Sequence, residues 1–433
     1  IIIEDILAGE VWIAGGQSNM EWPLKNAAGG RLAIDAANYP QIRCYNVQKL
    51  LYVGETDDNP EKFILSSAWR PATPDNVGDF SAVAYHFALD LHEKLGVPVG
   101  IISCNLGGSS ASAWTSRDYL RRDADVHSYV DEYEASARQI DMEDYIAKTT
   151  QAARMMAQAP MPLDPEHENE SFMDLSNMPA HFQRILQTVL QPGPRSPFGH
   201  PGSLFCNMVM TIVPYTAKGV IFYQGESDDV KARLYARLFS LLIQNWRDSF
   251  ENQDLWFLFV QLAAYGREGN PGGETYALLR EQQAIVAQTV PRTAVAAALD
   301  LGHYFDIHPR RKAPVGQRLA RLARNKIYGE PIESSGPVYR SMAIDGNKII
   351  LHFDHAESGL ICPDNKLKGF RVAGANRLYF DAEATIDGNT VIVSSPDVPM
   401  PAAASYGWAN YVEVNLYNGD GLPAFPFKTD KYL

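Results

Sequence analysis

The stretch VWIAGGQSNMEWP, residues 11–23, decides the fold. Its first half is a mostly apolar run without polar alternation, as expected for a parallel strand that is covered on both faces. Gly15 and Gly16 end the run, and Ser18 follows them. Such glycines allow a tight turn that presents a hydroxyl beside backbone N–H groups. Ser18 is therefore a candidate nucleophile, and the competing interpretation is a serine that caps the next helix or turn.

Apolar runs of this kind alternate with helical patterns to about residue 330. Five further apolar runs follow, namely IRCYNV (42–47), VGIISCNLGG (99–108), GVIFYQGE (219–226), LWFLFVQLA (255–263) and TAVAAALDL (293–301). Between them, apolar residues recur at helical spacing, as in Phe80, Val83, Phe87, Leu91 and Leu95, in Val230, Leu234, Leu238, Leu242 and Trp246, and in Val315, Leu319, Leu322 and Ile327. Alternating strands and helices predict an α/β fold with a doubly wound parallel sheet.

Two regions depart from this rhythm. Residues 115–200 are polar and Met-rich and end in QPGPRSPFGHPG, which predicts a helical insertion followed by a loop. From about residue 332, MAIDGNKIILHF and ATIDGNTVIVSS each place DGN between β-like runs, which is hairpin chemistry. RLYF and YVEVNLYN add further β-like segments. We therefore expect an α/β domain over residues 1–330 and a small β-rich module over 331–433, packed on the first domain.

Composition excludes several classes of function. The 433 residues carry a net charge of −13, so we expect no nucleic acid partner. No apolar run is long enough to span a membrane, so we expect no membrane insertion. The four cysteines show no CxxC spacing and predict neither a zinc site nor a disulfide framework, and we expect no metal and no cofactor. The chain starts without Met, and its first segment already has the pattern of a structural element. We therefore expect a mature or truncated product, located outside the cell or in the periplasm.

Polar residues that could complete a reaction follow the other strands. Ligands of open α/β sheets bind beyond the carboxyl ends of the strands, where these residues would meet. Gly107 and Gly108 could bring a backbone N–H to an oxyanion, and Gln224 could add a side-chain N–H. His308 could take the Ser18 proton. No phosphate-binding GxxxxGK[ST], GxGxxG after the first strand or HExxH competes with this set.

The motifs GQSNMEW, GGSSASAW, YQGESD and DIHPRRK, in this order and spacing, resemble the sialate O-acetylesterase-like branch of the SGNH hydrolases. FCNMVMTIVPYTAKGVIFYQGES and SYGWANYVEVNLYNGDGLPAFPFKTD also resemble segments of that family, and the resemblance is weakest over 120–195. It implies a flavodoxin-like α/β catalytic domain, a Ser/His hydrolytic site without metal, and O-acetylated sugars, often sialic acid, as substrates.

On this basis we expect Ser18 as nucleophile, His308 as base and Asp306 as the acid of a triad. The oxyanion hole would use the N–H groups of Ser18 and Gly108 and the amide of Gln224. Substrate contacts are expected from Gln17, Glu226 and Trp114.

The sequence leaves several choices open. Phe305 occupies the usual DxxH acid position, so a Ser–His dyad with a backbone carbonyl on the ring competes with the triad; Glu226 and Asp300 are reserve acids. Acetylxylan or another polysaccharide ester competes with sialic acid as substrate, and Arg117 or Arg310 beside the site would favour the carboxylate of sialic acid. A non-catalytic sugar-binding protein, with Trp22 and Trp114 stacking on sugar rings, is the alternative to an enzyme.

Overall fold

The structure, a computed structural model, describes residues 5–49, 67–141, 144, 200–266 and 269–430, and these form two compact units. The first unit takes the described residues up to Phe259 together with Val286–Thr293 and Arg310–Gln317. The second takes Val260–Ile285, Ala294–Pro309 and the described residues from Arg318 onward. The second unit contains residues on both sides of residue 330, so the domain boundary expected there stays a prediction.

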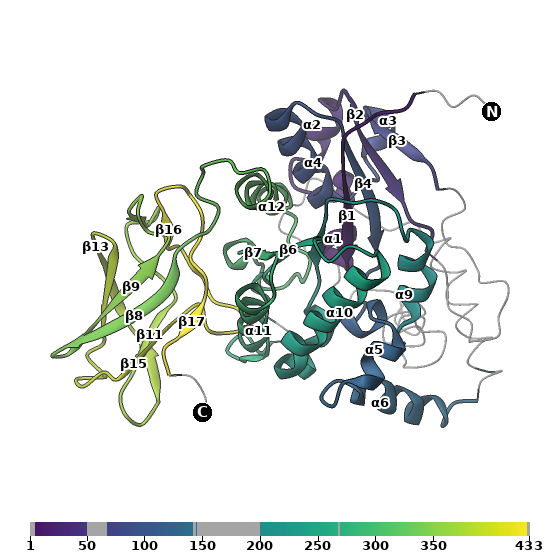
Figure 1. Ribbon diagram of the computed structural model, residues 1–433. Helices are drawn as coiled ribbons and strands as arrows, with labels where there is room; N and C mark the ends of the chain where they lie inside the picture. Colours follow the sequence, from purple (N-terminus) through teal and green to yellow (C-terminus); the bar gives the residue numbers. More distant parts are fainter. Residues whose placement is uncertain (1–4, 50–66, 142–143, 145–199, 267–268, 431–433) are drawn as a thin grey trace. The chain divides into compact units, whose positions relative to one another are not determined.

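A seven-stranded sheet in the order β3-β2-β4-β1-β5-β6-β7 carries the predicted apolar runs (Figure 1). The strands are β1 (Glu10–Gly16), β2 (Tyr39–Asn46), β3 (Trp69–Ala72), β4 (Val99–Asn105), β5 (Gly219–Tyr223), β6 (Trp256–Val260) and β7 (Thr293–Ala296). The neighbours from β2 to β6 pair in parallel, whereas β3 is antiparallel to β2. The α/β class is confirmed, with one antiparallel edge strand that the sequence did not predict.

Three of the longer helices match the predicted apolar stripes: α4 (Ala82–Leu95), α10 (Tyr235–Ser249) and α12 (Ala313–Lys326). For the other two, α6 (Ser128–Ala137) and α11 (Thr275–Thr289), no stripe was predicted. Helix α4 starts where Ser81 Oγ accepts the Ala84 N–H at 3.2 Å, and it ends at Gly96 with φ of 68°. The inclusion of Val230 in the buried stripe of α10 is wrong, because that residue lies in a separate 3-10 segment and is 74% exposed.

Shorter helical segments complete the connections. They are α1 (Ser18–Glu21), η1 (Leu24–Asn26), α2 (Gly30–Asp35), α3 (Pro74–Val77), η2 (Ala111–Trp114), α5 (Arg117–Arg122), α9 (Ser203–Asn207), η3 (Val209–Thr211), η4 (Glu226–Leu234) and η5 (Leu299–Leu301). Helices α5 and α6 fall in the predicted insertion, of which residues 142–143 and 145–199 lie outside the described residues.

Helices cover both faces of the central strand β1. The Trp12 ring packs edge-on against Phe87 of α4, with ring centroids 4.9 Å apart. Gly15 is paired in register with Phe222, which stacks on Phe239 of α10 at 5.2 Å. Trp12 and Gly15 are three residues apart, and side chains alternate along a strand, so the two helices lie on opposite faces. This double coverage explains why the run shows no polar alternation.

Antiparallel strands occupy the C-terminal part of the second unit. They are β8 (Val338–Asp345), β9 (Lys348–Asp354), β10 (Leu360–Ile361), β11 (Phe370–Ala373), β12 (Tyr379–Asp381), β13 (Glu383–Asp387), β14 (Thr390–Ser394), β15 (Ala403–Tyr406), β16 (Tyr417–Asn418) and β17 (Phe427–Lys428). They form four-stranded sheets in the orders β12-β11-β15-β17 and β13-β14-β9-β8, together with a β10-β16 pair.

Both DGN hairpins are confirmed. Strand β8 pairs with β9 and β13 with β14, and the turn glycines Gly346 and Gly388 have φ of 59° and 58°. Both four-stranded sheets contribute to one apolar core, which includes Ile349, Leu351, Val372, Val391 and Tyr406. In the part of the chain that the structure describes, no helix has the length and apolar character needed to cross a membrane.

Candidate active site

The turn after β1 is tied to the strands on both sides. The Gln17 N–H donates to the Tyr223 carbonyl at 2.9 Å, and the Leu106 N–H donates to the Gly16 carbonyl at 3.0 Å. Gly16 has φ of 126°, and a Cβ there would lie 2.1 Å from the Tyr223 carbonyl oxygen, so only glycine fits. Ser18 opens α1 directly after this turn and is half-buried.

The glycine pair after β4 lies against Ser18. A Cβ on Gly107 would lie 3.3 Å from the Ser18 Cβ, so a side chain there would crowd the candidate nucleophile. The Gly107 N–H donates to Glu21 Oε2 at 2.5 Å, and Lys49 donates to the other oxygen of that carboxylate. Burial lowers the pKa of Lys49 to about 8. Gly108 is exposed and has φ of 70°, and its predicted role as oxyanion donor remains a proposal.

Gln224 lies close to Gln17 but is engaged inside the protein. Its Nε2 donates to Asp228 Oδ2 at 2.6 Å and to the Ser109 carbonyl at 3.1 Å, and Tyr235 OH donates to its Oε1 at 2.8 Å. The side-chain amide has two hydrogens, and both have acceptors here. These contacts do not support the oxyanion role expected for Gln224; they fit a residue that holds the loop after β4.

Asp228 anchors the same loop, and the sequence analysis did not single it out. It is 1% exposed and accepts hydrogen bonds from Ser110 Oγ at 2.6 Å and from the Ala111 N–H at 2.8 Å. Burial raises the pKa of Asp228, and the bonds from Ser110, Ala111 and Gln224 oppose that rise. A second acid two residues after Glu226, in QGESD, was the signal that could have identified it.

Glu226 belongs to a buried polar chain behind Ser18. Asn19 Nδ2 donates to Glu226 Oε1 at 2.5 Å, and Lys312 Nζ donates to Asn19 Oδ1. Lys312 is 1% exposed, and its Nζ lies 5.7 Å from the centre of the Trp22 ring. Burial raises the pKa of Glu226, and Asn19 and the Lys312 charge oppose it. Glu226 therefore supports the Ser18 turn, whereas substrate contact was expected.

Gln17 is also largely covered, at 2% exposed. With its amide nitrogen turned toward acceptors, it donates to the Ser109 carbonyl and to Glu226 Oε2, both at 3.3 Å. Its side chain thus joins the loops after β4 and β5, and the predicted substrate contact remains a proposal.

Trp114 is a core residue, which corrects the expectation of a substrate contact. The side chain is 0% exposed, and its Nε1 donates to Ser109 Oγ at 2.8 Å. Trp22, the other tryptophan considered for stacking on sugars, is 5% exposed. Both rings are closed to solvent because α1 and η2, which carry or flank them, pack inside the first unit.

The loop that carries His308 belongs to the second unit. Asp306 Oδ1 accepts the backbone N–H of His308 at 2.8 Å but lies 3.8 Å from the ring Nδ1. The second distance is too long for a hydrogen bond, so Asp306 fixes the loop and acts on the ring only through its charge. Asp300, a reserve acid, accepts two 2.7 Å bonds from Arg318.

His303 stabilises this loop from within. Its Nδ1 accepts the N–H groups of Phe305 at 3.2 Å and Asp306 at 3.1 Å. An accepting Nδ1 places the proton of a neutral imidazole on Nε2. The Asp306 bond to the His308 N–H continues the same series, so side chains fix the backbone from His303 to His308.

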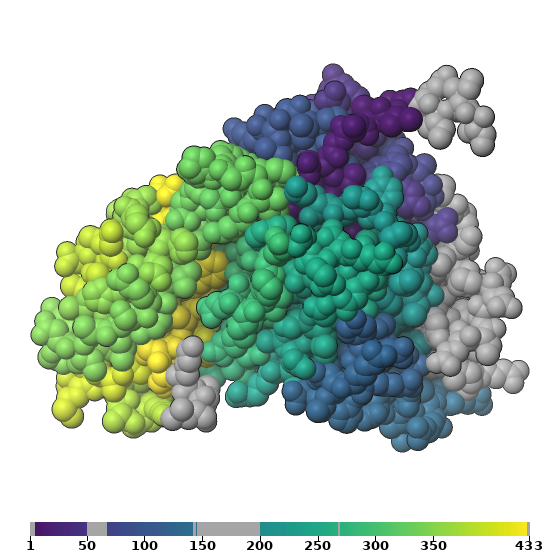
Figure 2. All heavy atoms as spheres, viewed as in Figure 1, coloured from purple at the N-terminus to yellow at the C-terminus, as the bar shows by residue number. Residues whose placement is uncertain are grey.

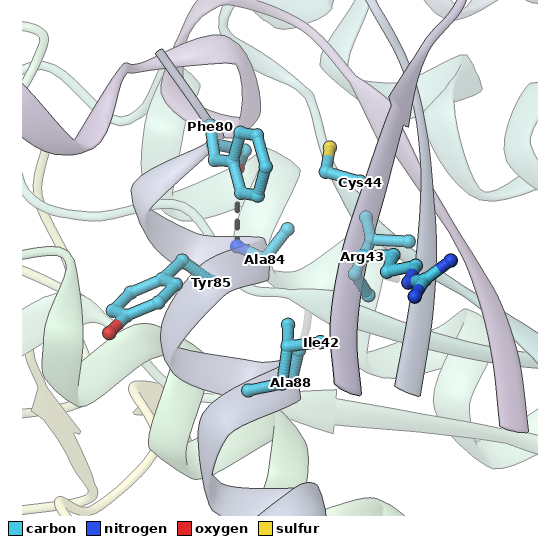
Figure 3. A pocket seen from close by; sticks show the side chains of 9 residues that line it. Ile42, Arg43, Cys44, Phe80, Ala84, Tyr85 and Ala88 are labelled. Atoms are coloured by element: carbon cyan, nitrogen blue, oxygen red, sulfur yellow. Dashed lines mark hydrogen bonds between the residues drawn. The ribbon is translucent and has the colours of Figure 1, made fainter. Parts of the chain in front are cut away.

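Other candidate features are occupied elsewhere. Arg117, a possible partner for a sugar carboxylate, pairs with Glu134 at 2.8 Å. A small pocket lined by Ile42, Cys44, Phe80, Ala84 and other residues lies between α4 and strands β2 and β4 (Figure 3) and contains none of the predicted site residues. Burial raises the pKa of Cys44 to about 12, so its thiol is unreactive. Among the described residues, no group of three or more His, Cys, Asp or Glu could hold a metal ion.

Comparisons with known proteins agree on one family. Residues 196–325 match the family described as "Carbohydrate esterase, sialic acid-specific acetylesterase". The Sialate O-acetylesterase of Mus musculus is 27% identical over 389 residues, which are 84% of this chain and 65% of the mouse protein. The Homo sapiens Sialate O-acetylesterase is 24% identical over 462 residues, 98% of this chain and 76% of the human protein. The chain thus spans just under two thirds of the mouse protein.

A solved structure extends the likeness to the fold. The crystal structure of a carbohydrate acetylesterase from Xanthomonas citri shares 34% sequence identity and a TM-score of 0.75. The match covers 99% of this chain and 82% of that protein. This chain therefore belongs to the sialic acid-specific acetylesterase family of carbohydrate esterases.

Proposed function

We propose that this chain is a carbohydrate O-acetylesterase, with Ser18 as nucleophile and His308 as base. The observation that carries the proposal is the Ser18 turn, held between β4 and β5 with the glycine pair of the next loop against it. The relatives named as acetylesterases supply the class of ester. A serine held so closely to Gly107, with the exposed, positive-φ Gly108 next in the chain, suits attack on a carbonyl better than it suits sugar binding alone.

The proposed reaction has two steps through an acyl enzyme. Ser18 Oγ attacks the acetyl carbonyl while His308 takes its proton, and the N–H groups of Ser18 and Gly108 stabilise the oxyanion. His308 then protonates the sugar oxygen, which leaves as the alcohol. Water, activated by His308, attacks the acetyl group on Ser18 and releases acetate. Asp306 holds the loop through the His308 N–H, and its carboxylate lies 3.8 Å from the ring Nδ1.

We propose a flavodoxin-like SGNH catalytic domain with a β-rich module over 331–433. Counted without β2 and β3, the strands β1, β4, β5, β6 and β7 lie in the order 2-1-3-4-5, which is the flavodoxin order. The candidate motifs follow β1, β4 and β5 at their carboxyl ends, where this fold binds ligands. The strands from β8 onward, with their shared apolar core, support a separate module.

Acetylated sialic acid is the proposed substrate, after the names of the curated relatives. The test measures acetate release from O-acetylated N-acetylneuraminic acid and from acetylated xylo-oligosaccharides, with Ser18→Ala as the control. Release from the sialic acid that Ser18→Ala abolishes supports the proposal. Release from the xylo-oligosaccharides alone would assign a polysaccharide acetylesterase, and no release from either would remove the esterase function.

A further inference from the structure

Phe305 presents an apolar ring to solvent beside the proposed base. Its side chain is 71% exposed, whereas Asp306 and His308 on the same loop are 6% and 4% exposed. A single exposed apolar side chain needs no explanation. This one is backed by other aromatic rings: Tyr304 packs edge-on against Phe305 with centroids 4.6 Å apart, and Tyr411 packs edge-on against Tyr304 at 5.2 Å.

The backbone under these rings is fixed. The Phe305 N–H donates to His303 Nδ1 at 3.2 Å, and the Gly266 N–H donates to the Tyr304 carbonyl at 3.0 Å. A Cβ on Gly266 would lie 2.5 Å from that carbonyl oxygen, so the approach requires glycine. The Tyr411 N–H donates to the Pro271 carbonyl at 3.0 Å. The backbone that carries the rings is therefore held in place before any ligand arrives, which lowers the entropy cost of binding.

We propose that Phe305, backed by Tyr304 and Tyr411, is the platform on which the pyranose ring of the acetylated sugar stacks. A pyranose has a face of C–H groups, and their positive hydrogens suit the negative face of an aromatic ring. The platform offers an aromatic surface, so it recognises the ring body that sialic acid and xylose share. This inference rests on the proposed function, because it takes the sugar to be the ester that His308 helps to cleave.

The first experiment compares Phe305→Ala with wild type on two esters: the acetylated sugar that wild type cleaves best and butyl acetate, which has no sugar ring. We expect KM for the sugar ester to rise roughly three- to tenfold with little change in kcat, as for loss of one aromatic contact. Hydrolysis of butyl acetate should be unchanged, and Phe305→Trp should restore the sugar KM. The matched control is Phe380→Ala, because Phe380 is also exposed, at 38%, but lies on β12.

The results separate the platform from other roles of Phe305. Equal losses on both esters would mean that the ring supports the His308 loop, and no change on either would mean that it does not meet substrate; both overturn the platform. Binding of the deacetylated sugar, N-acetylneuraminic acid or xylobiose, is followed in parallel by saturation-transfer NMR. If wild type cleaves neither ester but binds a sugar that Phe305→Ala does not bind, the esterase function fails and the platform stands. If both proteins bind the sugars equally or not at all, the platform fails.

Discussion

Replacing Lys312 with Met should show how much the buried polar side chains behind Ser18 contribute to the free energy of unfolding. Met has a similar length and no charge, so Lys312→Met removes the cation and the hydrogen bond to Asn19 but keeps most of the packing. Glu226 would then be a buried carboxylate without the Lys312 charge. Removing one partner from a buried charge pair typically costs 3–5 kcal/mol. We expect about 3 kcal/mol, since Glu226 keeps its bond from Asn19 and can take up a proton.

The pH dependence of this loss follows from the sign of the Glu226 shift. Burial raises the pKa of Glu226, so the folded protein binds this proton more tightly than the unfolded chain does. The stabilisation of the fold by protonated Glu226 is therefore lost as pH rises. Removing Lys312 raises the pKa further, because its positive charge lowers it in wild type. The destabilisation by Lys312→Met should therefore be smaller at pH 5 than at pH 7.5. Glu226→Gln in the Lys312→Met background should recover part of it, because the buried charge is gone.

Urea unfolding followed by tryptophan fluorescence measures these free energies at both pH values. Lys25→Met is the matched control, since Lys25 pairs with Asp79 at 2.7 Å while the two side chains are 54% and 66% exposed. Such a surface pair contributes about 0–1 kcal/mol. A loss for Lys312→Met no larger than for Lys25→Met, or one independent of pH, would refute the reasoning.

Three further substitutions test the proposed chemistry. Ser18→Ala and His308→Ala should each lower acetate release by about 10³-fold or more. Because the pair acts as a unit, the double variant should be little worse than either single one, and additive losses in kcat would contradict this. Asp306→Asn should lower kcat less than tenfold, since the carboxylate makes no ring hydrogen bond in the structure; a loss near 10⁴-fold, as in a working triad, would restore it as the triad acid. Gln224→Met should lower the thermal midpoint along with kcat, because the amide holds Asp228 and Ser109; a fall in kcat alone would return Gln224 to the oxyanion hole.

The buried parallel strands could be predicted because their physics is local. Runs such as VWIAGG and GVIFY are apolar without alternation, which only a strand covered on both faces tolerates. The DGN hairpins were predictable because Gly346 and Gly388 must adopt positive φ. Strand β3 could not be predicted, because its four residues include a proline and its pairing with β2 is a tertiary property.

Site residues were harder to predict, because burial decides their roles. The sequence pointed to Ser18 and the glycine pair, which the structure brings together. It did not distinguish the fully buried Trp114 from the exposed Phe305, although both are aromatic residues near a motif. Lys312 looked like one member of a basic DIHPRRK loop, and only the fold shows that it is closed off from solvent.

The backbone hydrogen bonds around Gly16 also determine how often the Ser18 turn can open. The N–H groups of Gln17 and Leu106 are held by carbonyls across two strand junctions at the middle of the sheet. Their exchange with deuterium requires β1 to separate from β4 or β5, so both amides should exchange on the time scale of global unfolding. The exposed Gly108 amide, on the loop beside them, should exchange far sooner. The proposed nucleophile would thus rest on the slowest-exchanging part of the sheet, while exchange at Gly108 reports on the neighbouring loop.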